Sequence, residues 1–531
     1  MTSATALPTQ APDVPSDRSE LILEVVAPDP ATTGPGSEFR DLVHSVRESA
    51  NWTTMAIADR VHSDADPGAL DTARQVADEL GRFPLVHVTG KGRTAGELTE
   101  LAAKAARAGV DEALLMTGDR IKDRAREHGG RVPYTDSVNL VELWRQHAPQ
   151  VRRGAVVNPF KLVEEDLRNQ LLKLNLKVGA GADVVTTQIG FSWPVYVEFL
   201  RYAARAHPGV PVRAAVCYLP MGVARVFAAG SVPGVVLPSS VWARIQRDAA
   251  DPGARTLYAR RVAVQVLTLR ALGYNGVQVA CLHRPVGAER VAAAIEDLER
   301  ERLSRDDLCA LWEQSVPLDP AVRYPIAHQA ETGLASRLER ARYRALDAVD
   351  HAMFDPDNPV GAQSTAAVRA LGARPAGRRL LQVVEDASKR PLVGCQMCGF
   401  CRLPHTMYVC PETCPKGLAN GPCGGTSDGT CEFGDRPCIH NLKYRTAQAF
   451  DRLDQLAHTV IPPVPEPIRG SSSWLNHAQG RDPQLRQVPP PGATPIPLHP
   501  AAHGVDQVVR GEPLKDRDSQ PILPATGTTR R

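Results

Sequence analysis

The sequence lacks the features that would mark a membrane protein or a nucleic-acid-binding protein. No stretch of the 531 residues approaches the ~20 uninterrupted apolar residues of a membrane span, and the first 19 residues show no basic patch followed by an apolar run. An excess of one charge is also missing, since 62 Lys and Arg oppose 59 Asp and Glu. We therefore expect a cytoplasmic protein with no membrane or nucleic-acid partner.

Cysteine is scarce outside one segment. Only Cys217, Cys281 and Cys309 lie elsewhere, and we expect them to be small buried apolar residues. The other eight lie between Cys395 and Cys438. Thiols in a reducing compartment are poor candidates for structural disulfides and better candidates for metal ligands. The segment therefore predicts an inorganic site.

Eight short apolar runs alternate with helical patterns over the first 300 residues. Unbroken apolar runs are typical of parallel strands that are buried on both faces. Eight such strands, each followed by a helix, predict a closed (β/α)₈ TIM barrel, an α/β fold. An open doubly wound sheet is the alternative. The predicted strands cover residues 21–27, 52–58, 84–89, 113–117, 154–157, 183–187, 212–217 and 276–281.

The rest of the chain divides by composition. We expect a disordered tail over residues 1–18, the barrel over 19–310, a helical connector over 311–385, a cysteine-rich domain over 386–461 and a disordered Pro-rich tail over 462–531. Within the connector, prolines at 356, 359 and 375 predict a loop-like stretch over residues 355–377. Residues 441–458 predict a closing amphipathic helix.

Polar residues stand at the ends of most predicted strands, where a barrel of this kind carries its chemistry. Glu24 is notable because its neighbours are apolar, so an ionised carboxylate there needs a partner or a raised pKa. A carboxyl group tuned upward in this way suits a general acid. A structural salt bridge is the alternative for Glu24. The other strand-end residues are Asp59, His87, Gly118, Asp119, Asn158, Gln188, His283 and Arg284.

The barrel region resembles a known family in five segments that occur in order. They are LEVVAP, HVTG, LLMTGD, KVGAGADVVTTQ and VACLHR, and they resemble 5,10-methylenetetrahydrofolate reductase over roughly residues 20–300. The resemblance implies a barrel that binds FAD. It also implies hydride transfer from a reduced nicotinamide through the flavin to the methylene carbon, which gives 5-methyltetrahydrofolate, so the enzyme is an oxidoreductase acting on a CH–NH donor.

The resemblance also implies roles for single residues. Glu24 matches the general acid of the family, Asp119 the aspartate between flavin and folate, and Gln188 a glutamine that contacts folate. Arg284 matches an arginine near the substrate, and Met221 stands where a phenylalanine usually stacks on folate or nicotinamide. The positions that match the FAD contacts of the family are His87, Thr117, Gly118, Asp119, Asn158 and Lys177.

The sequence departs from the family around these positions. Aromatic residues are missing beside Glu24, and Thr117 replaces an FAD-contacting arginine. The electron donor therefore stays open between NADH, NADPH and a ferredoxin-like protein.

The cysteine-rich segment contains CQMCGFC, CPETCPKG and GPCGG. Two-residue gaps let neighbouring thiolates turn onto one metal or cluster, so the spacing predicts a [4Fe–4S] cluster, two zinc ions, or one of each. The segment resembles the domain found with methylenetetrahydrofolate reductases of bacteria that use ferredoxin-like electron flow, which implies electron delivery to the flavin. Zinc that merely folds the segment is the alternative. The predicted ligands are Cys395, Cys398, Cys401, Cys410, Cys414, Cys423, Cys431 and Cys438.

Three functions follow from these patterns. The first is FAD-dependent reduction of methylenetetrahydrofolate, with electrons from NAD(P)H or from a cysteine-ligated cluster. The second is a folate barrel that transfers methyl or methylene groups without net redox chemistry. The third is a zinc-stabilised binding protein whose barrel is inactive.

Overall fold

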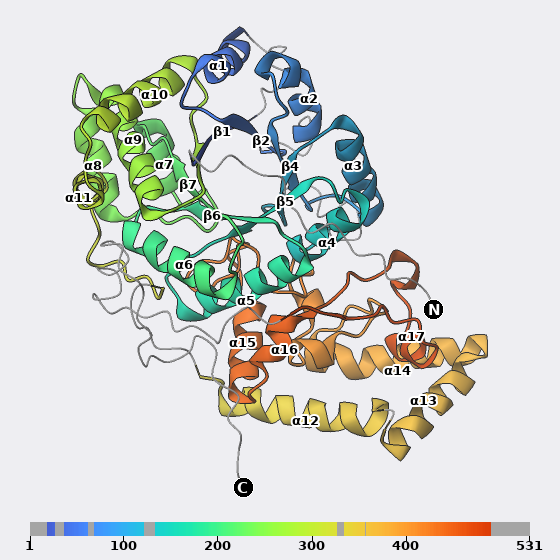
Figure 1. The fold of residues 1–531 in the computed structure, drawn as a ribbon. Helices are drawn as coiled ribbons and strands as arrows, with labels where there is room; N and C mark the ends of the chain where they lie inside the picture. Colours follow the sequence, from blue (N-terminus) through green and yellow to red (C-terminus); the bar gives the residue numbers. More distant parts are fainter. Residues whose placement is uncertain are drawn as a thin grey trace.

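A computed structural model describes residues 19–26, 37–61, 68–121, 133–326, 334–355 and 357–489 of the chain. Two units lie side by side (Figure 1): a barrel drawn in blue to green and a C-terminal unit drawn in yellow to red. Helix α5 (Glu164–Ala180) of the barrel lies between them, next to α15 (Ile439–Ala449) and α16 (Leu453–His458) of the C-terminal unit.

The barrel is closed by eight parallel strands in sequence order, from β1 around to β8, which pairs with β1. All eight predicted strands are confirmed, with ends that differ from the prediction by two residues at most. Their apolar side chains are buried on both faces, as unbroken runs require. The strands are β1 (Glu20–Val26), β2 (Thr54–Ala58), β3 (Leu85–Thr89), β4 (Glu112–Met116), β5 (Arg152–Val157), β6 (Val184–Ile189), β7 (Val212–Cys217) and β8 (Gly276–Ala280).

Helices surround the strands; most of them bury one apolar face, whereas α5 and α9 (Ala254–Leu272) are buried on most sides. Helix α3 shows how local sequence fixes an end: Thr94 accepts from the backbone N–H of Glu97, whose side chain accepts from the backbone of Thr94. The other helices of the barrel unit, besides α5 and α9, are α1 (Ser37–Glu48), α2 (Ala69–Leu80), α4 (Ser137–His147), α6 (Trp193–Ala206), α7 (Met221–Ala228), α8 (Ser239–Ala249), α10 (Pro285–Arg300) and α11 (Arg305–Ser315), and α3 covers Ala95–Ala108.

The barrel unit continues beyond the expected boundary at residue 310. Trp312 is fully buried in the barrel core, and Tyr324 and Ile326 pack into the same core. The Trp312 indole N–H donates to the backbone oxygen of Phe191 at 3.3 Å. The boundary of the barrel unit is therefore placed near residue 326.

The connector is helical, but the loop expected within it is wrong. Helices α13 (Pro359–Gly372) and α14 (Pro375–Val393) both begin at a proline, and they follow α12 (Arg337–Phe354). Proline suits the first helical position, because its missing N–H has no intrahelical partner there and its φ is preset. Two of the prolines taken as breakers are thus helix starts, and Pro356 lies outside the described residues.

Two corrections concern the C-terminal end. The single helix expected over 441–458 is divided into α15 and α16. Residues 462–489, expected to be a disordered tail, include α17 (Ser473–Ala478) and the short strand β10 (Arg486–Gln487), which pairs with β9 (Thr459–Val460). Val488 packs so closely on Gly179 that a Cβ at that glycine would lie 2.4 Å from the Val488 Cβ. Residues 1–18 and 490–531 lie outside the described chain.

Helices in the described ranges are all too short or too polar to cross a bilayer.

Candidate functional site

The ends of β4, β5 and β6 meet at a cavity of about 100 Å³. Asp119 follows β4, Asn158 follows β5 and Gln188 lies near the end of β6. Residues of the C-terminal unit complete the wall, among them Cys423 and Glu432. The cavity therefore lies between the mouth of the barrel and the cysteine-rich domain. The predicted site residues that line it are Thr117, Gly118, Asp119, Asn158, Lys177 and Gln188.

Asp119 has the electrostatic character of an acid. Asp119 is exposed as a residue, but the atoms packed around its carboxyl group desolvate it and so raise its pKa. The nearby Glu432 carboxylate raises this pKa further, against the opposing effect of Lys416 and Lys91. A carboxyl group with a raised pKa keeps its proton to higher pH and can donate it to a bound molecule.

Glu24 lies in a different setting from Asp119. Its carboxylate on β1 accepts a hydrogen bond from Gln278 Nε2 on β8 at 2.6 Å, and the same nitrogen lies 3.3 Å from His87 Nε2 on β3. Burial lowers the pKa of His87, against the opposing charge of Glu24. The structure thus brings Glu24 and His87 together through Gln278, and neither lines the cavity that Asp119 and Gln188 share.

Two substrate-binding residues expected from the resemblance stand away from this cavity. Met221 begins α7, and Arg284 precedes α10. The Arg284 side chain is 79% exposed and lies 3.6 Å from Glu38 Oε1. Their predicted contacts with folate remain predictions.

Asp59, another strand-end residue, belongs to a structural ion pair. Arg93 binds both of its oxygens, at 2.6 and 2.9 Å, and Thr89 donates to it from its backbone and its hydroxyl. Burial alone would raise the pKa of Asp59, but these partners hold it below its ordinary value. All of these hydrogen bonds join the end of β2 to β3 and the residues that follow it, so the Asp59 carboxylate has a structural role.

Several residues that match the FAD contacts of the family already make hydrogen bonds to other groups of the protein. Lys177 Nζ donates to the backbone oxygen of Val156 at 2.5 Å, and its burial lowers its pKa to about 7. The Asn158 amide donates to the Gly234 oxygen at 2.7 Å. Thr117 Oγ1 accepts from the backbone N–H of Ser137 at 3.2 Å.

The loop of residues 421–425, which carries the GPCGG motif, closes this side of the mouth. Lys161 Nζ donates to the Gly424 oxygen at 2.6 Å, Lys173 Nζ to the Pro422 oxygen at 3.0 Å, and Gln170 Nε2 to the Cys423 oxygen at 3.0 Å. All three donors are buried side chains, with Lys161 just before α5 and Gln170 and Lys173 within it. The barrel therefore holds the loop through side chains that could otherwise face a ligand.

FAD does not fit this cavity while the loop stays in place. Sites for molecules of this size usually enclose ~300–1,000 Å³, well above the 100 Å³ found here. The Gly118 oxygen is also taken, since it accepts from Lys416 Nζ at 2.8 Å. Among the described residues, this cavity is thus smaller than a site for FAD while residues 421–425 stay in place.

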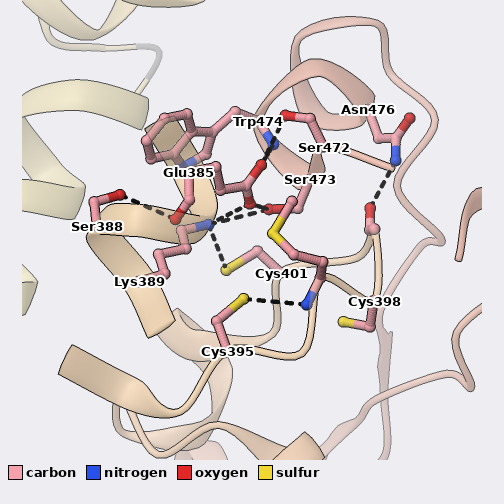
Figure 2. A network of polar contacts seen from close by, with 12 residues as sticks. Glu385, Ser388, Lys389, Cys395, Cys398, Cys401, Ser472, Ser473, Trp474 and Asn476 are labelled. Carbon is pink, nitrogen blue, oxygen red and sulfur yellow. Dashed lines mark hydrogen bonds and ion pairs between the residues drawn. The ribbon is translucent and has the colours of Figure 1, made fainter. Parts of the chain in front are cut away.

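The eight cysteines of the C-terminal unit form two groups. Cys395, Cys398, Cys401 and Cys410 line a cavity of about 20 Å³, and Figure 2 shows the first three close to Lys389. Lys389 Nζ lies 3.5 Å from Cys401 Sγ. We call this set the first quartet.

The second quartet consists of Cys414, Cys423, Cys431 and Cys438. Burial raises the pKa of the Cys438 thiol, and the nearby Cys423 and Cys414 raise it further. Cys431 acts on Cys414 in the same way. Cys423 belongs to this quartet and also lines the cavity at the barrel mouth.

Both quartets have the donor chemistry for zinc or iron, which thiolates bind strongly. As the side chains stand, no three His, Cys, Asp or Glu residues of the described chain are arranged to hold a metal ion. The thiols of each quartet would have to turn inward to do so. The groupings fit two separate centres in composition and position.

Several residues of the cavity could not be found from the sequence. Glu432 and Gln170 line it, and Lys416 pairs with Glu432 beside it. All three stand outside the strand ends, and nothing in their spacing links them to the barrel. The one available signal was the position of Lys416 inside the CPKG motif, between the cysteines.

Two family models match the chain. A model described as methylenetetrahydrofolate reductase matches residues 20–286, and one described as methylene-tetrahydrofolate reductase C terminal matches residues 375–465. No curated protein matches the sequence.

Solved structures are similar at low sequence identity. One is an uncharacterized protein from Clostridium thermocellum that binds two copies of 5-methyl-5,6,7,8-tetrahydrofolic acid; it is 12% identical, with 53% of this chain and 96% of that chain covered and a TM-score of 0.39. Another is assigned as a deoxyribose-phosphate aldolase from Toxoplasma gondii; it is 12% identical, with 52% and 94% covered and a TM-score of 0.29.

Proposed function

From the premise that this chain belongs to the methylenetetrahydrofolate reductase family, we propose that it reduces 5,10-methylenetetrahydrofolate to 5-methyltetrahydrofolate. The proposed cofactors are FAD in the barrel and a metal centre in each cysteine quartet, as a [4Fe–4S] cluster, zinc, or one of each. The proposed electron source is NAD(P)H or a ferredoxin-like protein that acts through the cysteine-rich domain.

The observation that carries this proposal is the shared cavity at the barrel mouth. Asp119 and Gln188 of the barrel and Cys423 of the second quartet line the same small space. A centre held by the second quartet would therefore lie beside the groups that the family uses on flavin and folate. A cysteine domain that served only to fold itself would not need to meet the barrel at this point.

The side chains suggest how proton transfer is arranged. Asp119, whose pKa is raised by burial and by Glu432, can hold a proton close to the reacting molecule. Gln188 can orient that molecule by hydrogen bonding, although its Oε1 now accepts from the backbone N–H of Ile189 at 2.9 Å. Glu24 is the general acid in this proposal, and its carboxylate is oriented by the hydrogen bond from Gln278 Nε2 at 2.6 Å.

One observation favours the non-redox alternative. The residues that match the FAD contacts are bonded to the protein, and the cavity is smaller than FAD requires. A folate barrel that transfers a methyl or methylene group would need no flavin.

Spectra and metal content of the anaerobically purified full chain separate the two functions. The reductase predicts flavin absorption bands, with FAD released on denaturation, and formation of 5-methyltetrahydrofolate when an artificial reductant is supplied. A colourless protein that still binds folate, takes up no added FAD and forms no methyl product under reducing conditions would contradict the reductase and support the alternative.

A further inference from the structure

A second pocket, much larger than the cavity at the barrel mouth, lies within the C-terminal unit. It encloses about 940 Å³ between α12, α14, α17 and the 3₁₀ turn η2 (Leu403–Thr406), and every residue that lines it belongs to the C-terminal unit. This volume is in the range of small-molecule sites, ~300–1,000 Å³. Neither the barrel chemistry nor metal binding by the quartets requires a pocket of this size here.

Aromatic rings form one wall of this pocket. Phe354 of α12 and Trp474 of α17 have ring centroids 6.1 Å apart, and Tyr408 also lines the pocket. Trp474 is partly exposed, so its indole remains accessible. Rings arranged in this way favour a planar aromatic ligand, because stacking and burial of apolar area act together.

Some polar atoms of the residues that line the pocket make no hydrogen bond. Among the described residues, three buried atoms of its lining make no hydrogen bond: the donor Trp474 Nε1 and the acceptors Gln455 Oε1 and Asp482 Oδ1. An unpaired buried polar atom costs about 1–3 kcal/mol. These atoms have almost no accessible surface, so a ligand that carries both N–H donors and nitrogen or oxygen acceptors would satisfy them only after the three side chains turn toward the pocket.

The charge of the lining disfavours phosphate groups inside the pocket. Four aspartates line it, at positions 347, 350, 355 and 482, against the cations Lys389 and Arg452. Lys389 is already bound by Glu385 Oε1 at 2.9 Å and Ser473 Oγ at 3.0 Å. A neutral heteroaromatic ring therefore suits the pocket better than a nucleotide phosphate.

The pocket adjoins the first quartet. Cys401 lines both the pocket and the small cavity of the quartet. Figure 2 shows Lys389 beside Cys401, and its ammonium also lies 5.1 Å from the centre of the Trp474 ring. A ligand stacked on Trp474 would lie next to a quartet cysteine.

We propose that this pocket binds a pteridine ring system, the fused nitrogen heterocycle that flavins and folates share. The ring is planar and neutral, and its edge alternates N–H donors with nitrogen and oxygen acceptors, which matches the aromatic wall and the three unpaired atoms. The site is separate from the barrel, so the proposal stands or falls independently of the proposed reductase activity.

Direct binding tests the proposal on the purified full chain. Riboflavin, which has no phosphate, and folic acid are titrated separately by fluorescence quenching and equilibrium dialysis. We expect at least one of them to bind. The compound that binds shows whether the natural ligand is a flavin or a folate. Trp474→Ala is expected to weaken that binding about tenfold, which is a typical loss for a stacked base. Failure of the wild-type chain to bind either compound would overturn the proposal.

A rim variant keeps the test valid if Trp474→Ala fails to fold. Leu392 lines the pocket and is 61% exposed, whereas Val383 on the same helix is 65% exposed and lies outside the lining. Leu392→Trp is expected to remove binding at this pocket, and Val383→Trp is expected to leave it intact. Binding that is the same in both variants would place the ligand outside this pocket and overturn the proposal.

Discussion

Lys416 of the cysteine-rich domain donates a hydrogen bond to the backbone oxygen of Gly118 in the barrel, at 2.8 Å. The same ammonium pairs with Glu432, and Glu432 Oε1 accepts from the backbone N–H of Arg120 at 2.6 Å. The domain thus holds the chain on both sides of Asp119. The position and the pKa of that carboxyl group depend on a domain that follows it by some 300 residues.

Removing the ammonium of Lys416 should destabilise the protein strongly. Lys416 and Glu432 are 2% and 3% exposed, so Lys416→Met leaves a buried carboxylate unpaired. Breaking a buried pair in this way costs about 3–5 kcal/mol. Lys104→Met is the control, because its pair with Asp71 is 42% and 54% exposed and such a pair is worth about 1 kcal/mol or less. Thermal or denaturant unfolding measures the free energy of unfolding of both variants. An equal loss in the two would show that the buried Lys416–Glu432 pair contributes no more than the exposed pair.

The raised pKa of Asp119 makes a prediction about stability and pH. Below the ordinary pKa of 3.8 the carboxyl group is protonated in both folded and unfolded chains. Between 3.8 and its raised folded pKa, the folded chain holds the extra proton, so stability falls as pH rises through this window. Asp119→Asn should remove this loss, so the variant should gain stability relative to wild type toward neutral pH. Unfolding measured from pH 3 to 8 tests this, and parallel curves for the two proteins would contradict it.

The barrel was predictable because each of its strands can be recognised from a short stretch of sequence. Each strand is an unbroken apolar run, and the order of the runs limits the topology to very few folds. The errors arose where context decides the outcome. A proline reads as a helix breaker or a helix start according to its neighbours, and the backbone beyond residue 461 is ordered by packing on Gly179 and α4, through Val488 and the 2.6 Å pair of Arg486 with Glu142.

The candidate site was predictable only in part, for the same reason. Strand ends placed Asp119 and Gln188 at one mouth, but the spacing of the sequence could not show that Glu24 pairs with Gln278 on the neighbouring strand β8. Nor could it show that the GPCGG loop occupies the space beside Lys161 and Asn158. Contacts between residues some 250 positions apart leave no periodic signal.

Single cysteine substitutions should remove one metal centre at a time. Cys398→Ser alters the first quartet and Cys423→Ser the second, so each should lose the metal of its own quartet and retain that of the other. Cys309→Ser, in the barrel unit and outside both quartets, should lose none. Iron and zinc analysis of anaerobically purified protein measures the content. Loss of all metal in both quartet variants, with folding intact by circular dichroism, would point to one shared centre instead.

Lys177 should give the opposite pH dependence to Asp119. Its pKa of about 7 in the folded chain lies below the ordinary 10.5, mainly because of burial and then because of Lys173. Between these values the unfolded chain holds more protons, so stability rises with pH from about 7 to about 10.5. Lys177→Met should reduce this rise but not remove it, because burial also lowers the pKa of Lys443 to about 7, whereas the surface variant Lys104→Met should keep the rise in full. Unfolding across that range measures the effect, and an equal rise in the two variants would show that Lys177 does not contribute.

The GPCGG loop can be displaced by a single methyl group. Gly234 has a φ of +73°, and a Cβ there would lie 2.1 Å from the Gly424 oxygen. Gly230 has a φ of +67°, with nothing within 4 Å of the same position. Both Gly→Ala changes strain the backbone by a similar amount, about 1–2 kcal/mol, but only Gly234→Ala collides with the loop. We expect Gly234→Ala to lower the hydrogen-exchange protection of residues 421–425 and, if the loop excludes FAD, to increase FAD binding relative to Gly230→Ala. Identical exchange and identical FAD affinity in the two variants would show that the loop is not what closes the mouth.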